Sequence, residues 1–168
     1  MTTAHKIPPE IFFRDLPKRH MSAGSLIFNS KQEMLIVKPS YKNYWQIPGG
    51  HSDAGETLRE TAARETFEEI GIHVTITAML CVNMNPAKGP VPDNIQSVFD
   101  AGILSDDQIS QIHLQNEEIV EYMFLPVAQA MPKLGPPHQR IVGQAIRARE
   151  LGTCFYLEDA ENIFDHNN

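Results

Sequence analysis

Acidic side chains crowd a short segment that follows a pair of glycines. Residues 53–69 contain six acidic residues and two basic ones. The acidic residues are Asp53, Glu56, Glu60, Glu65, Glu68 and Glu69, and the basic ones are Arg59 and Arg64. Glu65, Glu68 and Glu69 have the three- and four-residue spacing that places side chains on one helix face. Like charges at this spacing destabilise a helix by about 0.2–0.5 kcal/mol per pair, so a face of this kind needs a compensating partner.

A bound cation is one such partner. Carboxylates close to the carbonyl end of a helix also oppose the helix dipole, which strengthens the argument for a cation. Oxygen ligands without Cys or His favour Mg²⁺, with Mn²⁺ or Ca²⁺ as substitutes. Because Mg²⁺ keeps positions open for water and phosphate oxygens, the residues predict a phosphate ester or anhydride as substrate. An isolated E-x-x-E-E pattern is more often an ordinary solvated helix face than a metal site. The residues around the pattern must therefore decide between these two interpretations.

The same segment carries the signals of a helix that ends at Ile70. Thr57 and Glu60 form a capping box, and Gly71 supplies the left-handed residue that commonly follows a helix. Apolar and small residues gather opposite the carboxylates, at Ala62, Ala63, Thr66, Phe67 and Ile70. We therefore expect a helix with a buried back and a carboxylate front.

Residues 50–72 resemble the Nudix box, G-x5-E-x7-R-E-U-x-E-E-x-G-U, where U is a bulky aliphatic residue. The matching residues are Gly50, Glu56, Arg64, Glu65, Glu68, Glu69, Gly71 and Ile72. Seven of these positions demand one residue type, so a chance match is on the order of 10⁻⁸ per starting point. Thr66 departs from the pattern at a U position, where its hydroxyl can bond back to the carbonyl of Ala62.

The resemblance implies a fold and a set of roles. The fold is the α/β Nudix type, an α/β/α sandwich with a mixed β-sheet, and the resemblance extends loosely over residues 21–131. The implied metal ligands are the carbonyl of Gly50 and the carboxylates of Glu65, Glu68 and Glu69. Arg64 and Glu56 occupy positions that orient these carboxylates in the family.

Nudix enzymes take their general base either from the box or from a later loop. The later candidates are Glu117, Glu118 and Glu121. Glu118 is preferred as base or additional metal ligand because it lies six residues before Phe124, which takes the place of the family's usual Trp. Glu121 is the second choice. The alternative, in which all three are exposed charges on a strand edge, stays open.

The segment before the box supplies candidate substrate contacts. Lys38 and Lys42 are candidates for binding phosphates, and Trp45 for stacking on a base. Solvated lysines and a tryptophan that anchors the core are the competing interpretations. His51 is a weaker candidate phosphate donor, and the six other histidines show no ligand spacing.

Length and charge limit the class of protein. The chain has 168 residues, 42% hydrophobic residues and a formal net charge of -7. We expect one domain at 19–158, with an N-terminal arm at 1–18 and a polar tail at 159–168. The negative charge argues against extended nucleic acid as a partner. There is no run typical of a signal peptide or membrane span, and two cysteines without a pattern agree with a reducing compartment, so a cytoplasmic location is expected.

The remaining pattern predicts mixed strands and helices. Strands are predicted at 11–14, 21–28, 33–37, 74–82, 96–103, 119–125 and 154–157, the last as an edge strand. Helices are predicted at 106–112, 127–131 and 136–151 in addition to the box helix.

The leading functional hypothesis is a Mg²⁺-dependent pyrophosphohydrolase acting on a nucleoside diphosphate linked to another moiety, of the ADP-ribose or nucleotide-sugar type. Pro86, about fifteen residues past the box, gives weak support through some ADP-ribose hydrolases. One alternative is a nucleoside triphosphate pyrophosphohydrolase of the house-cleaning type. Another is a Nudix-fold nucleotide sensor without turnover, which the complete box disfavours. A small nucleotide is the expected partner, and a homodimer is expected by analogy with the family.

Overall fold

The structure is a computed structural model that describes residues 8–114 and 117–163. In chain order its elements are α1 (Pro9–Arg14), β1 (His20–Asn29), β2 (Met34–Pro39), β3 (Gly49–His51), α2 (Leu58–Ile70), β4 (Ala78–Asn85), β5 (Asn94–Leu104), α3 (Asp106–Ser110), β6 (Ile119–Leu125), α4 (Val127–Ala130), the 3₁₀ helix η1 (Met131–Lys133), α5 (Pro136–Leu151), β7 (Phe155–Glu158) and β8 (Glu161–Asn162).

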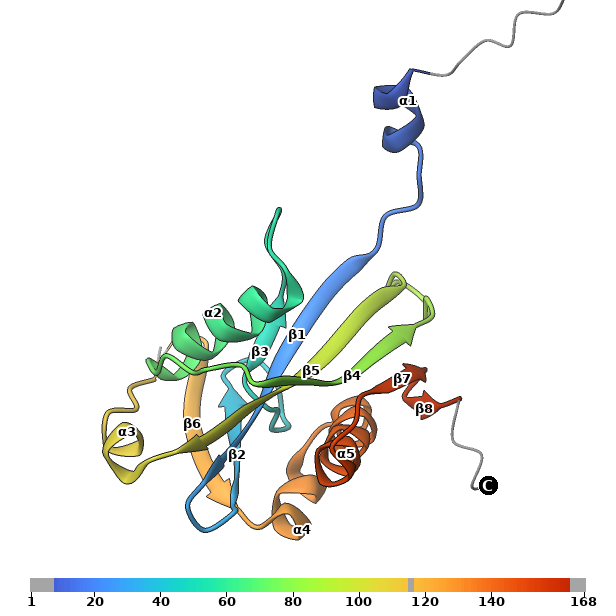
Figure 1. Cartoon of the computed structure of the whole chain (residues 1–168). Coiled ribbons are helices and arrows are strands. Elements are labelled where there is room, and N and C mark those ends of the chain that lie inside the picture. The colour runs from blue at the N-terminus through green and yellow to red at the C-terminus, as the bar shows by residue number, and fades with distance from the viewer. Residues whose placement is uncertain (1–7, 115–116, 164–168) are drawn as a thin grey trace, which may run out of the picture.

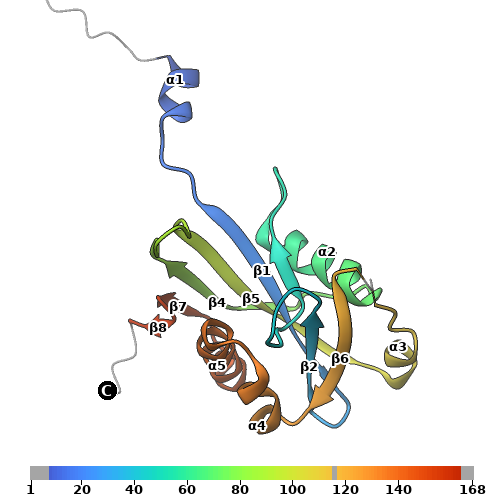
Figure 2. The same ribbon diagram turned by 180° about the vertical axis from the view of Figure 1, so that it is seen from behind.

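The strands of the described residues form one eight-stranded mixed sheet. Its order is β6-β2-β1-β5-β4-β7-β8, and β3 pairs with β1 outside this path. β1 runs parallel to β5, β4 runs parallel to β7, and the other pairs are antiparallel. Helix α2 covers one face of the sheet and α5 covers the other (Figures 1 and 2). The predicted α/β/α sandwich with a mixed sheet is confirmed.

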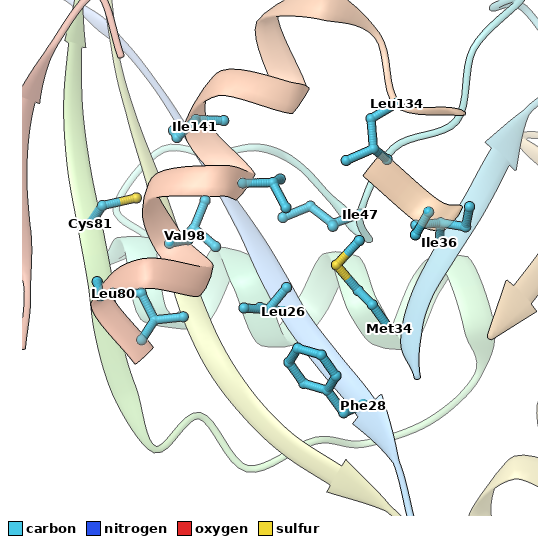
Figure 3. Close-up of a cluster of buried hydrophobic side chains, with 14 of the residues drawn as sticks. Leu26, Phe28, Met34, Ile36, Ile47, Leu80, Cys81, Val98, Leu134 and Ile141 are labelled. Carbon is cyan, nitrogen blue, oxygen red and sulfur yellow. The ribbon is translucent and has the colours of Figure 1, made fainter. Parts of the chain in front are cut away.

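Successive side chains of the central strands point to opposite faces of the sheet, and each face packs into its own hydrophobic core. Leu26 and Phe28 of β1 belong to the cluster beneath α5, together with Ile141 of that helix (Figure 3). Ile27, which lies between them in sequence, packs in the second cluster with Ile70 of α2. This alternation is the two-residue period of a strand buried on both faces, and it fixes both helices against the sheet.

Most predicted elements are confirmed, and the segments 11–14, 74–82 and 154–157 need correction. The segment 11–14, predicted as a strand, is part of helix α1, because Pro9 stands in the first turn and Glu10 and Arg14 complement the helix dipole. The strand predicted at 74–82 begins only at Ala78. Its first apolar residues, Val74 and Ile76, pack against the second core cluster from outside the sheet.

The ends of the described chain differ in their packing. Helix α1 has no buried residue and stands away from the sheet at the end of an extended connection (Figure 1). The prediction of an edge strand at 154–157 is wrong, because the short strand β8 pairs with β7 and takes the edge position. β8 lies inside the segment predicted as a polar tail, and the end of that tail is outside the described residues. Among the described helices, none has the length and apolar character needed to span a membrane.

Helix α2 begins and ends as predicted. Thr57 and Glu60 form both bonds of the capping box, and Gly71 ends the helix with φ of 72°. The predicted bond from Thr66 to the Ala62 carbonyl is present at 2.7 Å. The hydroxyls of Thr66 and Ser25 also lie 2.7 Å apart, and Ser25 Oγ lies 3.1 Å from the same carbonyl. This buried contact ties the box helix to β1.

Thr66→Val is expected to lower the free energy of unfolding by about 1 kcal/mol, the typical net contribution of one hydrogen bond. The loss is small because Ser25 can still donate to the Ala62 carbonyl. Urea unfolding measures it, with the exposed Thr75→Val as a matched control expected to change stability by less than about 0.5 kcal/mol. A loss of about 3 kcal/mol or more would show that Ser25 does not take over.

Candidate active site

Two glycines bring the start of the box against β1 and α2. Gly50 pairs with Ala23 and Gly49 with Gly24 in the antiparallel contact of β3 with β1. Gly49 has φ of 149°, and a Cβ there would lie 2.4 Å from the Ala23 carbonyl oxygen. A Cβ on Gly50 would lie 2.5 Å from the carboxyl group of Glu65. Side chains are thus excluded where the Gly50 backbone meets the acidic helix.

Helix α2 presents its three box glutamates at different depths. Glu65 and Glu68 line a cavity of about 470 Å³. Glu69 is only 2% exposed, beneath the backbone of the glycine turn. Ala62, which packs with Ala23 of β1, lies seven residues before Glu69 and therefore on the same side of the helix. The predicted division of the helix is therefore wrong at two residues: Glu69 lies on the buried side, and Phe67, which was expected there, is 40% exposed.

Arg64 is the centre of an ionic network. Its Nε donates to Glu56 Oε1 at 2.7 Å and its Nη2 to Glu56 Oε2 at 3.0 Å. Its Nη1 lies 2.7 Å from Glu68 Oε2 and 2.9 Å from Glu65 Oε1. Nη2 also donates to the His51 carbonyl at 2.9 Å, next to Gly50. The guanidinium thus links the turn to the cavity glutamates, which fits the predicted orienting role of Arg64 and Glu56.

This network sets the charge state of its members. The bond from Arg64, aided by the Asp53 N–H, lowers the pKa of Glu56 to about 2. The same bond raises the pKa of Arg64 further above its ordinary value. Both groups therefore remain charged throughout the neutral range. For Glu65, burial raises the carboxyl pKa, and Arg64 opposes that rise.

Glu69 is held by two donors in a buried position. The Gly49 N–H donates to Oε2 at 2.9 Å, and Gln46 Nε2 lies 3.4 Å from Oε1. Burial is the largest influence and raises the pKa of Glu69 to about 8. Gln46 in turn accepts from Lys42 Nζ at 2.8 Å. A polar chain therefore runs from the cavity wall to the box helix.

The cavity also brings Glu118 to the box, although it is about fifty residues away in sequence. Glu118 lines the same cavity as Glu65 and Glu68. Its backbone is fixed because its carbonyl accepts from the Ser40 N–H at 2.8 Å. Glu117, Glu118 and Glu121 are all exposed, but Glu117 and Glu121 are not among the described residues that line the cavity. This placement favours Glu118 over Glu121.

Of the three predicted substrate contacts, one lies at the cavity and two lie elsewhere. Lys42 lines the cavity, and burial lowers the pKa of its ammonium group. Lys38 Nζ instead donates to the Lys42 carbonyl at 2.8 Å. Trp45 packs against the core cluster that contains Leu134, and neither it nor Lys38 is among the described cavity residues. Its position agrees with the alternative of a core anchor.

Several cavity residues were not predicted from the sequence. His138, in the first turn of α5, lines the cavity, and burial lowers the pKa of its imidazole to about 4. Gln46 and Gln96 also line it. The Pro136-Pro137 pair marked the start of α5, but it did not reveal that this helix end would face the box.

The donor set suits a hard divalent cation. Glu65, Glu68, Glu69 and the Gly50 carbonyl provide only oxygen ligands, and the space a Gly50 side chain would fill is kept free for them. Within residues 8–114 and 117–163, no three acidic, histidine or cysteine side chains converge as ligands of one ion. Glu65 and Glu68 turn to Arg64 instead. Metal binding would therefore require these two carboxylates to share or leave the guanidinium.

Comparison with known proteins agrees with this geometry. The NUDIX domain family matches residues 18–145 of the chain. A Bacillus subtilis protein provisionally named an 8-oxo-dGTP diphosphatase is 36% identical over 61 residues, which are 36% of this chain and 41% of that protein. An ADP-ribose pyrophosphatase of Methanocaldococcus jannaschii is 24% identical over 124 residues, which are 72% of this chain and 70% of that protein.

A solved structure supports the same relationship. The MutT protein of Methanosarcina mazei Go1 has a TM-score of 0.64 and 26% sequence identity, and the match covers 82% of this chain and 99% of that chain. The present chain spans less than half the length of the Bacillus relative. The family match nevertheless covers most of the sequence and contains the whole site described above. The chain belongs to the Nudix family.

Proposed function

We propose that the chain is a Mg²⁺-dependent pyrophosphohydrolase that cleaves the phosphoanhydride of a nucleoside diphosphate linked to another moiety. The observation that carries this proposal is one cavity lined by Glu65 and Glu68 of the box helix and by Glu118 from a distant loop. Hydrolysis of a phosphoanhydride needs charge neutralisation, an activated water and in-line geometry. Carboxylates gathered around one cavity, with Lys42 in its wall, can meet these needs.

The residues that would hold Mg²⁺, with Mn²⁺ as a substitute, are Glu65, Glu68, Glu69 and the Gly50 carbonyl. When bound, the metal supplies charge neutralisation and polarises a phosphoryl oxygen. Arg64, held by Glu56, fixes the positions of Glu65 and Glu68 beside the cavity, and the two carboxylates would share the guanidinium with the cation. Lys42 binds a phosphate oxygen. Its ammonium group already lies at the cavity wall, 5.1 Å from the centre of the Tyr41 ring.

Glu118 is proposed as the general base that removes a proton from the attacking water, or as an additional metal ligand. It is a loop carboxylate that lines the cavity and belongs to neither the box helix nor the Arg64 network. A base placed there acts on a water in the cavity while the box glutamates hold the cation. Glu121, on β6 opposite Lys38, does not share this position.

Glu118→Gln is expected to lower kcat at least tenfold. General acid–base catalysis typically contributes a factor of about 10² to 10⁴, so loss of the base should produce a decrease of this size or larger. The amide keeps the size of the side chain and removes its basicity. Glu121→Gln is the matched control and should stay within twofold of wild type. Steady-state kinetics with Mg²⁺ separates the two; near wild-type turnover of Glu118→Gln would falsify the assignment.

The ADP-ribose or nucleotide-sugar class is proposed for the substrate. The relative from Methanocaldococcus jannaschii is named an ADP-ribose pyrophosphatase, and its alignment covers 72% of this chain. The Bacillus subtilis relative favours the rival, a nucleoside triphosphate pyrophosphohydrolase, over a shorter alignment. A nucleotide sensor without turnover is the remaining alternative, and the complete set of box glutamates argues against it.

A hydrolysis screen tests the function directly. The panel contains ADP-ribose, nucleotide sugars, dinucleotides, and canonical and oxidised nucleoside triphosphates, each with Mg²⁺, Mn²⁺ or a chelator. Turnover that needs the metal supports the enzyme, and the products identify the bond that is cleaved. Preference for triphosphates would favour the rival, and tight binding without turnover would favour the sensor.

We also propose a cytoplasmic homodimer in which the arm at 1–18 contributes to the interface. Phe12 and Phe13 of α1 are 50% and 65% exposed, which is unusual for large apolar side chains on a free helix. Sedimentation is expected to show a dimer for the full chain and a monomer for a chain that lacks residues 1–18. A monomeric full chain would contradict this arrangement, and so would a dimer that survives the deletion.

A further inference from the structure

One face of β1 is apolar toward the end of the strand and polar toward its start. Leu26 and Phe28 lie in the core beneath α5, whereas Gly24 and Ser22 line the cavity. The parallel neighbour β5 repeats this change, because Val98 pairs with Gly24 and Gln96 pairs with Ser22. Paired residues on neighbouring strands share a face. The floor of the cavity is therefore apolar near α5 and becomes polar away from it.

The polar floor continues into a second hollow. Two residues before Ser22, His20 pairs with Asn94 of β5. His20, Asn94 and His51 line a hollow of about 220 Å³. His51 also lines the larger cavity and pairs with Ser22. The two hollows thus meet at His51, the residue that follows Gly50 of the box.

The second hollow lacks the Lys, Asp and Glu side chains that line the active-site end of the larger cavity. Its described lining is histidine, asparagine, proline and valine, without a Lys, Arg, Asp or Glu. The charged residues, including Lys42, Glu65 and Glu118, line the larger cavity. Lys and Arg are the usual partners of an additional phosphate, and the described lining of the second hollow has neither, which disfavours the end of a triphosphate there.

The polar side chains along this path have spare hydrogen-bonding capacity. Ser22, His20, His51 and Gln96 together offer a hydroxyl, two imidazoles and an amide. Each lines one or both hollows, and its side chain makes no hydrogen bond to another residue in the part of the chain that is described. Asn94 differs, because its Oδ1 accepts from Asn85 at 2.9 Å. The four therefore form a polar strip available to a ligand.

We propose that this polar strip binds an uncharged, hydroxyl-rich group, of the sugar class, carried on the far side of the scissile phosphoanhydride. The inference rests on the proposed function and specifies its substrate class. Hydroxyl groups can pair with amide, imidazole and serine side chains without requiring a charge. The second hollow has room for roughly seven waters at about 30 Å³ each, which suits a small polyol. Tyr41, whose phenol ring lines the larger cavity, lies beside Lys42 and not among the residues of the strip.

Gln96→Met and His20→Leu test the strip, with Gln129→Met on the exposed side of α4 as the matched control. For ADP-ribose and ADP-glucose, each strip variant is expected to raise KM about tenfold while kcat stays within twofold. KM for ATP should change less than twofold, because ATP carries no sugar beyond its phosphates. Equal effects on all substrates, or no effect on the ADP-sugars, would overturn the proposal.

A binding measurement separates failure of the strip from failure of the proposed function. ADP-ribose and ADP are titrated calorimetrically, with Mg²⁺, into the Glu68→Gln chain with and without Gln96→Met. The preference for ADP-ribose over ADP is expected to fall about tenfold with Gln96→Met. An unchanged preference refutes the strip even in a chain that hydrolyses ADP-sugars, whereas a lost preference upholds it even if no turnover is found.

Discussion

Glu68→Gln is expected to lower kcat by about a thousandfold or more while the protein stays folded. Glu68 lines the cavity and accepts from Arg64 Nη1 at 2.7 Å. The amide can keep an oxygen directed at Arg64, so the helix and the network lose little. It removes the negative charge that would hold the cation. A metal contributes several kcal/mol to transition-state stabilisation, and each 1.36 kcal/mol corresponds to a factor of ten in rate.

Glu150→Gln is the matched control for this experiment. It makes the same change of charge near the exposed end of α5, remote from the cavity lining. Turnover should remain within twofold of wild type, and circular dichroism should show equal folding of both variants. If Glu68→Gln retained more than a third of wild-type turnover, Glu68 would be dispensable and the metal assignment of the box would need revision.

The box could be predicted from the sequence because its interactions are local. Thr57, Glu60 and Gly71 define helix α2 within a single segment, and the structure confirms all three roles. The contacts of Arg64 with Glu56 and Glu68 also join residues within one loop and helix. At this range, spacing in sequence determines distance in space.

The rest of the cavity could not be predicted, because sheet pairing assembles it. Gln96 reaches the cavity through the parallel pairing of β5 with β1, and His138 through the packing of α5. Gln46 contacts Glu69 across 23 residues of sequence. No local pattern marks these side chains. The misplaced strand start at Val74 has a related origin, because packing against a core produces the same apolar alternation as a strand.

Arg64→Lys is expected to reduce kcat/KM by about 10- to 100-fold, the usual range for a residue that orients metal ligands. Arg64 engages both oxygens of Glu56, the Glu68 carboxylate and the His51 carbonyl at the same time. A lysine has one compact ammonium group and lacks this rigid fork of donors. Positive charge is kept, so the substitution isolates geometry from electrostatics.

Arg59→Lys provides the control, because Arg59 lies exposed in the first turn of the same helix. Its kinetics should match wild type. Titration with Mg²⁺ then identifies how Arg64 acts. If it orients the carboxylates, Arg64→Lys raises the Mg²⁺ concentration needed for half-maximal rate, and excess metal restores much of kcat. If Arg64 instead contacted the substrate, KM would rise at every metal concentration, and the network around Glu56 would be structural support rather than a device for positioning ligands.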